Sequence, residues 1–192
     1  MDTFVLKDSV TGGMTDDEFL RFCLENKDLR IERNSNLEII IMSPVTSMDS
    51  HYCAEIVAQL RNWNRIKNQG IVFDSSAGFT LPDRSVLSPD ASWVSLNTWN
   101  ALSENDKNKF APICPEFVIE VRSKSDQLEH QKEKMKIWIR NGAQLAWLID
   151  VREEMIYVFR PNVSEEGTSF DKKIIGERPV VGFELDLTLL KI

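Results

Sequence analysis

Residues 88–94, Ser-Pro-Asp-Ala-Ser-Trp-Val, and residues 115–122, Pro-Glu-Phe-Val-Ile-Glu-Val-Arg, are the two stretches that decide the fold of this chain. Each holds an acidic residue, Asp90 or Glu120, beside a run of apolar, β-branched and aromatic residues that is typical of a buried strand. A carboxylate in a protein core is costly unless it has a partner. Both positions therefore require a cation, a shared proton or a metal ion.

The remaining sequence predicts one mixed sheet flanked by helices. Helices are expected from Thr15, from about Asp49 to Lys67, and from about Asp126 to Asn141, where capping or turn residues adjoin apolar positions at helical spacing. Further strands are expected over residues 37–42, 71–74, 78–82, 145–149 and 155–159. Residues 95–115 are expected to form a helical or irregular excursion. The strand, helix, strand order over residues 117–149 predicts a crossover unit, and the fold class is α/β (α+β).

Length and composition indicate one ordinary globular domain over residues 1–192, with 42% hydrophobic and 28% charged residues. The apolar runs are too short to cross a bilayer, so we expect no membrane partner. Residues 1–7 lack the pattern of a secretory signal, and the three cysteines are odd in number and far apart; both features predict a cytoplasmic protein with free thiols. A net charge of −7 argues against a strong nonspecific grip on nucleic acid.

The two acidic residues and a nearby arginine suggest a chemistry. Glu120 and Arg122 are two positions apart on the expected strand and point to the same face. With Asp90 on a neighbouring strand, the carboxylates would hold Mg²⁺ for phosphodiester hydrolysis while the arginine steadies the developing charge. The structural alternative is a buried salt bridge among the three. His51 and His130 are too few for a zinc cluster, although His130 remains a candidate for a phosphate contact.

The sequence resembles the Uma2 family, also called DUF820, of the PD-(D/E)XK restriction-endonuclease-like superfamily. The resemblance covers nearly the whole chain and rests on several stretches in the same order: residues 38–44, 73–79, 88–94 and 115–126, followed by 134–135, 141–143 and 147–150. It implies a restriction-endonuclease-like domain with a central mixed β-sheet flanked by helices. Activity still has to be argued from the site, because one fold supports many functions.

The resemblance also implies roles for individual residues. Asp90 and Glu120 are expected to bind the metal, and Glu32 to orient metal or water. The superfamily's usual lysine two positions after the second acid is replaced by Arg122, which cannot act as a base but can bind phosphate. Lys134 on the following helix matches the lysine that takes over this duty in the family. Helical spacing keeps Lys132 as the alternative, because it lies nearer the centre of the apolar face.

We therefore expect a Mg²⁺-dependent deoxyribonuclease, with Mn²⁺ as a substitute, in which water attacks a DNA phosphodiester. Lys134 would position or activate the water and Arg122 would stabilise the charged phosphorus centre. Cutting both strands of a duplex with one site per chain favours a homodimer. The alternative function is a catalytically inactive module that keeps the nuclease fold for nucleic-acid or protein binding, which the replacement of lysine by Arg122 would permit.

Overall fold

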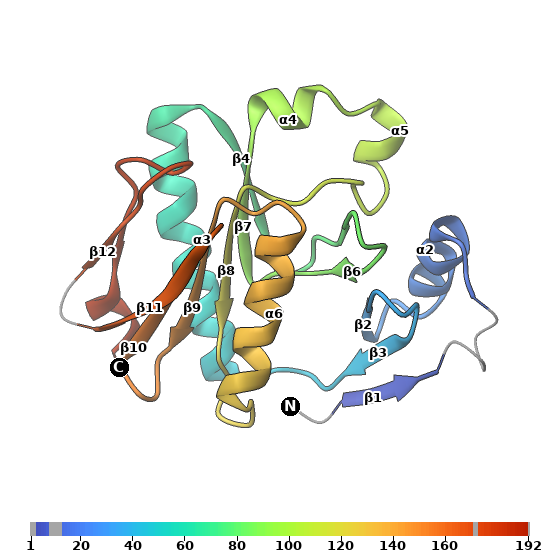
Figure 1. Cartoon of the computed structure of the whole chain (residues 1–192), viewed down its shortest axis with the longest axis horizontal. Helices are drawn as coiled ribbons and strands as arrows, with labels where there is room; N and C mark the ends of the chain where they lie inside the picture. The colour runs from blue at the N-terminus through green and yellow to red at the C-terminus, as the bar shows by residue number, and fades with distance from the viewer. Residues whose placement is uncertain (1–2, 8–12, 171–172, 192) are drawn as a thin grey trace.

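The structure is a computed structural model that describes residues 3–7, 13–170 and 173–191. A six-stranded mixed sheet forms its centre (Figure 1). Its strands, in spatial order, are β11 (Val163–Ser169), β10 (Met155–Arg160), β9 (Leu145–Asp150), β8 (Phe117–Val121), β7 (Ala91–Ser95) and β4 (Gly70–Asp74). β8 and β9 pair in parallel and every other neighbouring pair is antiparallel. The mixed sheet and its crossover unit agree with the prediction, but the strands expected over residues 37–42 and 78–82 belong to a second sheet instead of this one.

Two long helices cover opposite faces of this sheet (Figure 1): α3 (Ser47–Lys67) and α6 (Leu128–Arg140). The α3 face packs Ile56, Leu60 and Trp63 against Phe117, Ile119 and Val121 of β8. The α6 face packs Met135 and Trp138 against Val118, Ala146 and Leu148. Because successive side chains of a strand alternate between faces, Glu120 shares the face of Val118 and lies under α6.

The first two helices begin at the residues that the sequence predicts or close to them. Thr15 caps α2 (Asp16–Glu25) with a complete capping box, as expected. Thr46 caps α3 slightly earlier than predicted. The same helix ends at Lys67, as predicted, where Asn68 adopts the left-handed conformation (φ 50°) that closes many helices.

The start of α6 differs from the prediction. Asp126 does not cap the helix, because its carboxylate accepts a hydrogen bond from the Ser123 amide at 3.0 Å in the preceding turn. The helix begins at Leu128, and Gln127 at its N-cap makes no side-chain capping bond. At the other end Gly142 follows the helix with φ 121°, the terminating role expected for it.

A second, antiparallel sheet lies on the far side of α6 from β10 and β11 (Figure 1). It contains, in spatial order, β1 (Thr3–Leu6), β3 (Ile39–Met42), β2 (Arg30–Arg33), β6 (Val86–Leu87) and β5 (Phe79–Thr80). The packing of Phe19 against Ile39 and Val86 joins α2 to this sheet. The sequence did not predict β2, because three of its four residues are charged and such residues give a weak strand signal.

The remaining elements are two short helices between β7 and β8 and three short elements near the C-terminus. Residues 95–115 contain two short helices, α4 (Leu96–Asn100) and α5 (Glu104–Lys107), within an otherwise irregular excursion, as predicted. Near the C-terminus lie β12 (Lys173–Ile175), β13 (Glu184–Asp186) and the 3₁₀ helix η1 (Leu187–Leu190). Met1 and Asp2, part of the segment tested for a secretory signal, lie outside the described residues. None of the described helices combines the length and apolar character that a membrane crossing requires.

Candidate active site

A cavity of about 560 Å³ lies where α6, the end of β8 and the second sheet meet. Alternate residues of β2 and their cross-strand partners on β3 form one wall of it: Arg30 opposite Met42, and Glu32 opposite Ile40. Asp90, Glu120 and Lys134 also line the cavity, and the exposed His130 lines its rim. The structure thus brings together four of the five residues singled out in the sequence, Glu32, Asp90, Glu120 and Lys134.

Asp90 is held at the start of β7 and tied to the neighbouring strand. Its Oδ2 accepts a hydrogen bond from the backbone amide of Val121 at 2.8 Å. Burial raises the pKa of Asp90, and this outweighs the opposing effects of the Val121 bond, Lys134 and Arg30. The carboxylate also lies close enough to Cys53 of α3 to help burial raise the pKa of that thiol. Asp90 is therefore a half-buried acid that would gain from a cation.

Glu120 is almost fully buried, with 4% of its surface exposed. Its Oε1 accepts hydrogen bonds from the indole Nε1 of Trp138 at 2.9 Å and forms an ion pair with Lys134 Nζ at 2.9 Å. Burial raises the pKa of Glu120 to about 7, and the charges of Asp90 and Glu32 add to the rise although Lys134 opposes it. A second cation beside Glu120 and Asp90 would relieve this repulsion.

Lys134 is the cation that joins the acids. Its Nζ lies 2.9 Å from Glu120 and 3.2 Å from Glu32. Burial alone would lower the pKa of Lys134, but Glu120, Glu32 and Asp90 together raise it above its ordinary value. The ammonium therefore stays protonated at neutral pH, and it serves as a hydrogen-bond donor and a fixed positive charge instead of a base.

Lys132, the alternative to Lys134 from helical spacing, lies elsewhere. Its ammonium pairs with Glu165 at 2.7 Å and lies 4.4 Å from the centre of the Tyr157 ring. Both partners belong to the β10 and β11 side of α6. The cavity occupies the edge of the buried face of α6 and not its centre, which is why Lys134 reaches it.

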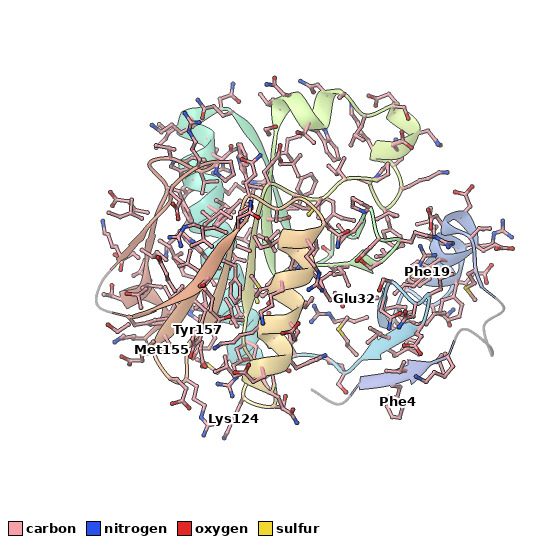
Figure 2. All side chains as sticks on the ribbon, in the orientation of Figure 1. Phe4, Phe19, Glu32, Lys124, Met155 and Tyr157 are labelled. Atoms are coloured by element: carbon pink, nitrogen blue, oxygen red, sulfur yellow. The ribbon has the colours of Figure 1, made fainter. Side chains whose placement is uncertain are left out.

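Glu32 lies on the face of β2 that is turned toward α6, as Figure 2 shows. It is buried, and its Oε1 accepts a hydrogen bond from the Ser88 amide at 2.9 Å in addition to the ion pair with Lys134. Glu32 thereby connects the second sheet to the segment that leads into Asp90. Its contacts fit a residue that orients its neighbours.

Arg122 is the one predicted site residue that the structure does not bring to this group. Its Nη1 pairs with Asp150 on β9 at 2.5 Å, its Nε donates to the Asp126 carbonyl at 3.1 Å, and the residue does not line the cavity. Among the described residues it forms no ion pair with Asp90 or Glu120, so the structural alternative, a salt bridge of these three, is wrong. The parallel register of β8 and β9 explains this, because it sets Asp150 beside Arg122.

Replacing Arg122 with methionine should mainly lower stability. Asp150 is fully buried, and without the guanidinium its charge is left uncompensated. Breaking such a pair costs about 3–5 kcal/mol of unfolding free energy, whereas removing both charges together costs much less. Urea denaturation of Arg122→Met, beside the double variant Arg122→Met/Asp150→Leu, measures this. Equal stability of wild type and the single variant would contradict the structural role.

A divalent metal fits the oxygen donors at this site. Glu120 is buried and Asp90 half-buried, both have a raised pKa, and Glu120 Oε2 accepts no hydrogen bond within the described part of the chain. Mg²⁺ and Mn²⁺ prefer carboxylate oxygens, and Mg²⁺ keeps several waters when only one or two carboxylates bind it. In the described ranges no cluster of three or more His, Cys, Asp or Glu residues is set to hold a metal. Asp90 and Glu120 are the two carboxylates whose oxygens could hold such an ion.

The raised pKa of Glu120 predicts how stability depends on pH in the absence of metal. The pKa rises from 4.5 in the unfolded chain to about 7 in the fold, so the folded state favours the protonated acid. That contribution is complete below pH 4.5 and is lost as the pH rises through 7. Glu120→Gln should therefore be more stable than wild type by about 3 kcal/mol at pH 8 and by less than about 1 kcal/mol at pH 5. Urea denaturation in EDTA tests this, and a difference that does not grow with pH would refute it.

Two contacts of the site are not evident from the sequence. Trp138 reads as a core residue, and it is one, but its indole N–H also fixes Glu120. Cys53 reads as a buried thiol, and the structure adds that it lines the cavity next to Asp90. Trp138 follows Lys134 by four residues, one helical turn, so the two side chains lie on the same side of α6. This spacing is the signal in the sequence that Trp138 and Lys134 share a neighbour, which the structure shows to be Glu120.

The fold and this carboxylate and lysine group define a chain of the restriction-endonuclease-like class. The comparisons with known proteins agree: the family model Uma2, described as "Putative restriction endonuclease", matches residues 16–188. The chain belongs to the Uma2 family. It is also similar to a solved structure of a "putative nuclease belonging to DUF820" from Anabaena variabilis ATCC 29413, with a TM-score of 0.72 and 22% identity over 92% of this chain and 97% of the other. No curated protein matches the sequence.

Proposed function

We propose that this protein is a divalent-metal-dependent DNA endonuclease. The observation that carries the proposal is the grouping of two carboxylates of raised pKa, the half-buried Asp90 and the buried Glu120, with the ammonium of Lys134 in one cavity. Membership in a family described as "Putative restriction endonuclease" supports DNA as the substrate, and the likeness to a structure described as a "putative nuclease" supports the fold for this chemistry.

Asp90 and Glu120 would hold Mg²⁺ or Mn²⁺. When bound, the metal supplies Lewis-acid polarisation of the phosphate and lowers the pKa of a water. The amide of Val121 and the indole of Trp138 fix one oxygen of each carboxylate, so the two acids are oriented before any ligand arrives. Such preorganisation is what a metal site needs from the protein around it.

The other two residues would handle water and charge. Lys134, protonated and held by Glu120 and Glu32, would donate a hydrogen bond to the attacking water and stabilise negative charge at the phosphate. Glu32 would keep Lys134 aimed at Glu120. Arg122 would contribute only to stability, through its ion pair with Asp150 between β8 and β9. It would not make the direct phosphate contact expected from the sequence. A homodimer would supply the two sites required to cut both strands.

Nicking of supercoiled plasmid tests the proposal. Purified protein in Mg²⁺ or Mn²⁺ should convert supercoiled DNA to open circles, and EDTA should stop the reaction. Single-stranded DNA and RNA in parallel reactions define the substrate class. If none of these substrates is cleaved with either metal, the proposed nuclease activity is refuted and the binding module is the better explanation. Cleavage that continues in EDTA would refute the role of the metal.

A further inference from the structure

The wall of the cavity carries two side chains of permanent positive charge, Lys134 and Arg30, and they differ in what they contact. Lys134 is engaged by Glu120 and Glu32. The guanidinium of Arg30 makes no hydrogen bond or ion pair with any residue of the described ranges. Its charge is nevertheless felt at Asp90, where it lowers the pKa against the larger effect of burial. Arg30 therefore presents its donors to the cavity within electrostatic reach of a proposed metal ligand.

Two other arginines, Arg33 on β2 and Arg122 after β8, are already engaged by protein partners. Arg33, fully buried, binds Asp16 at 2.5 Å and the Arg84 carbonyl at 2.9 Å. Arg122 binds Asp150. Since a buried or bonded guanidinium has to give up its partner before it can bind a ligand, neither is suited to receive a phosphate.

The strand places Arg30 well for a ligand that reaches the acids. Arg30 and Glu32 are two positions apart on β2, so they project from the same face about 7 Å apart along the strand. Their cross-strand partners Met42 and Ile40 line the same cavity, which confirms that this face is its wall. A side chain as long as arginine can span from there toward a phosphate bound near Asp90.

Within the group formed by Lys134, Arg30 and the carboxylates that they act on, charge also favours an anion, and the other acidic residues of the cavity lining, Asp49, Asp83, Asp126 and Glu133, are not part of this group. Three carboxylates, Glu32, Asp90 and Glu120, face two cations, Lys134 and Arg30. A divalent ion would leave this group of five side chains with one net positive charge, which matches the single negative charge of a phosphodiester. Without Arg30 the group would be neutral. The planar guanidinium also offers paired N–H groups that fit two phosphate oxygens.

We infer that Arg30 binds the DNA phosphate at the candidate active site, the task that the sequence pattern assigns to Arg122. This inference rests on the proposed nuclease function and adds to it a substrate-binding residue on the second sheet. Arg30 is a contact to substrate and not to metal, so its loss should affect cleavage and metal binding differently.

The test compares Arg30→Gln and Arg30→Lys with Arg152→Gln, which removes the same charge from an exposed position in the turn between β9 and β10. Plasmid nicking in Mg²⁺ and the affinity for Mn²⁺ without DNA are measured on each. Arg30→Gln should slow nicking about 100-fold, the loss typical of one donor to the reacting group. It should bind Mn²⁺ at least as tightly as wild type, because a positive charge near Asp90 has been removed. Arg30→Lys should recover part of the nicking, and Arg152→Gln should nick within about twofold of wild type.

The results separate the nuclease activity of the protein from the phosphate contact of Arg30. If wild type nicks and Arg30→Gln nicks equally well, the phosphate contact is refuted and the nuclease stands. If Arg30→Gln loses nicking together with Mn²⁺ affinity, Arg30 supports the metal site and the assignment to phosphate is overturned. If wild type nicks nothing, the nuclease is refuted and the role of Arg30 falls with it. Circular dichroism establishes that each variant is folded.

Discussion

Replacing Asp90 with asparagine should abolish DNA cleavage while the protein stays folded. The amide oxygen of asparagine can still accept the hydrogen bond from the Val121 amide, so the local structure is kept. The negative charge is lost, and with it half of the proposed metal site. We expect the nicking rate to fall at least about 1000-fold, comparable to the loss of a principal electrostatic group in other active sites.

Stability should not fall with activity in this variant. Burial raises the pKa of Asp90, so the fold already disfavours the charged acid, and a neutral residue of the same shape removes that cost. The matched control is Asp49→Asn, because Asp49 lines the same cavity at the start of α3 without belonging to the acidic group. Asp49→Asn should nick within about threefold of wild type. Full activity in Asp90→Asn would remove Asp90 from the metal site.

Replacing Lys134 with methionine should slow nicking about 100-fold and shift its pH dependence. Methionine retains much of the lysine stem but removes the charge that Glu120 and Glu32 share. Because Lys134 opposes the rise in the pKa of Glu120, that pKa should climb further above 7 when the ammonium is absent. Metal binding requires the ionised carboxylate, so the pH at which nicking reaches half of its maximum should move to higher values.

Lys132→Met is the matched control for this prediction. It removes the same charge from the same helix two residues away, where the lysine pairs with Glu165 and the Tyr157 ring instead of the acids. Nicking by Lys132→Met should stay within about threefold of wild type, with an unchanged pH profile. The opposite result, activity lost in Lys132→Met and kept in Lys134→Met, would show that helical spacing and not the ion pairs identifies the active lysine.

The sequence was sufficient to predict the acidic pair and the sheet beneath it. Asp90 and Glu120 stand out because each interrupts an apolar strand pattern, and β8 and β7 then bring both to one place. The strand, helix, strand unit over β8, α6 and β9 was equally plain in the periodicity. These features depend on local patterns and on the pairing of strands, both of which leave a clear signal in the residues.

The features that the sequence did not reveal depend on contacts between distant segments. The pairing of Arg122 with Asp150 follows from the register of two strands joined by a helix, which no local pattern encodes. The choice between Lys132 and Lys134 depends on where the second sheet meets α6. The sequence does not single out Arg30, because β2 is short and mostly charged and the strand that brings Arg30 and Glu32 to the cavity gives only a weak signal.

The most direct test of the account is the number of Mn²⁺ ions bound by metal-free protein at pH 8, measured by electron paramagnetic resonance for wild type and for Asp90→Asn. Manganese is chosen because it takes the same oxygen ligands as Mg²⁺ and its free and bound forms are distinguishable. We predict one saturable Mn²⁺ site in wild type. In Asp90→Asn this site should be absent or its Mn²⁺ affinity should fall at least about 100-fold. Equal Mn²⁺ binding by the two proteins would contradict the claim that Asp90 and Glu120 form the metal centre.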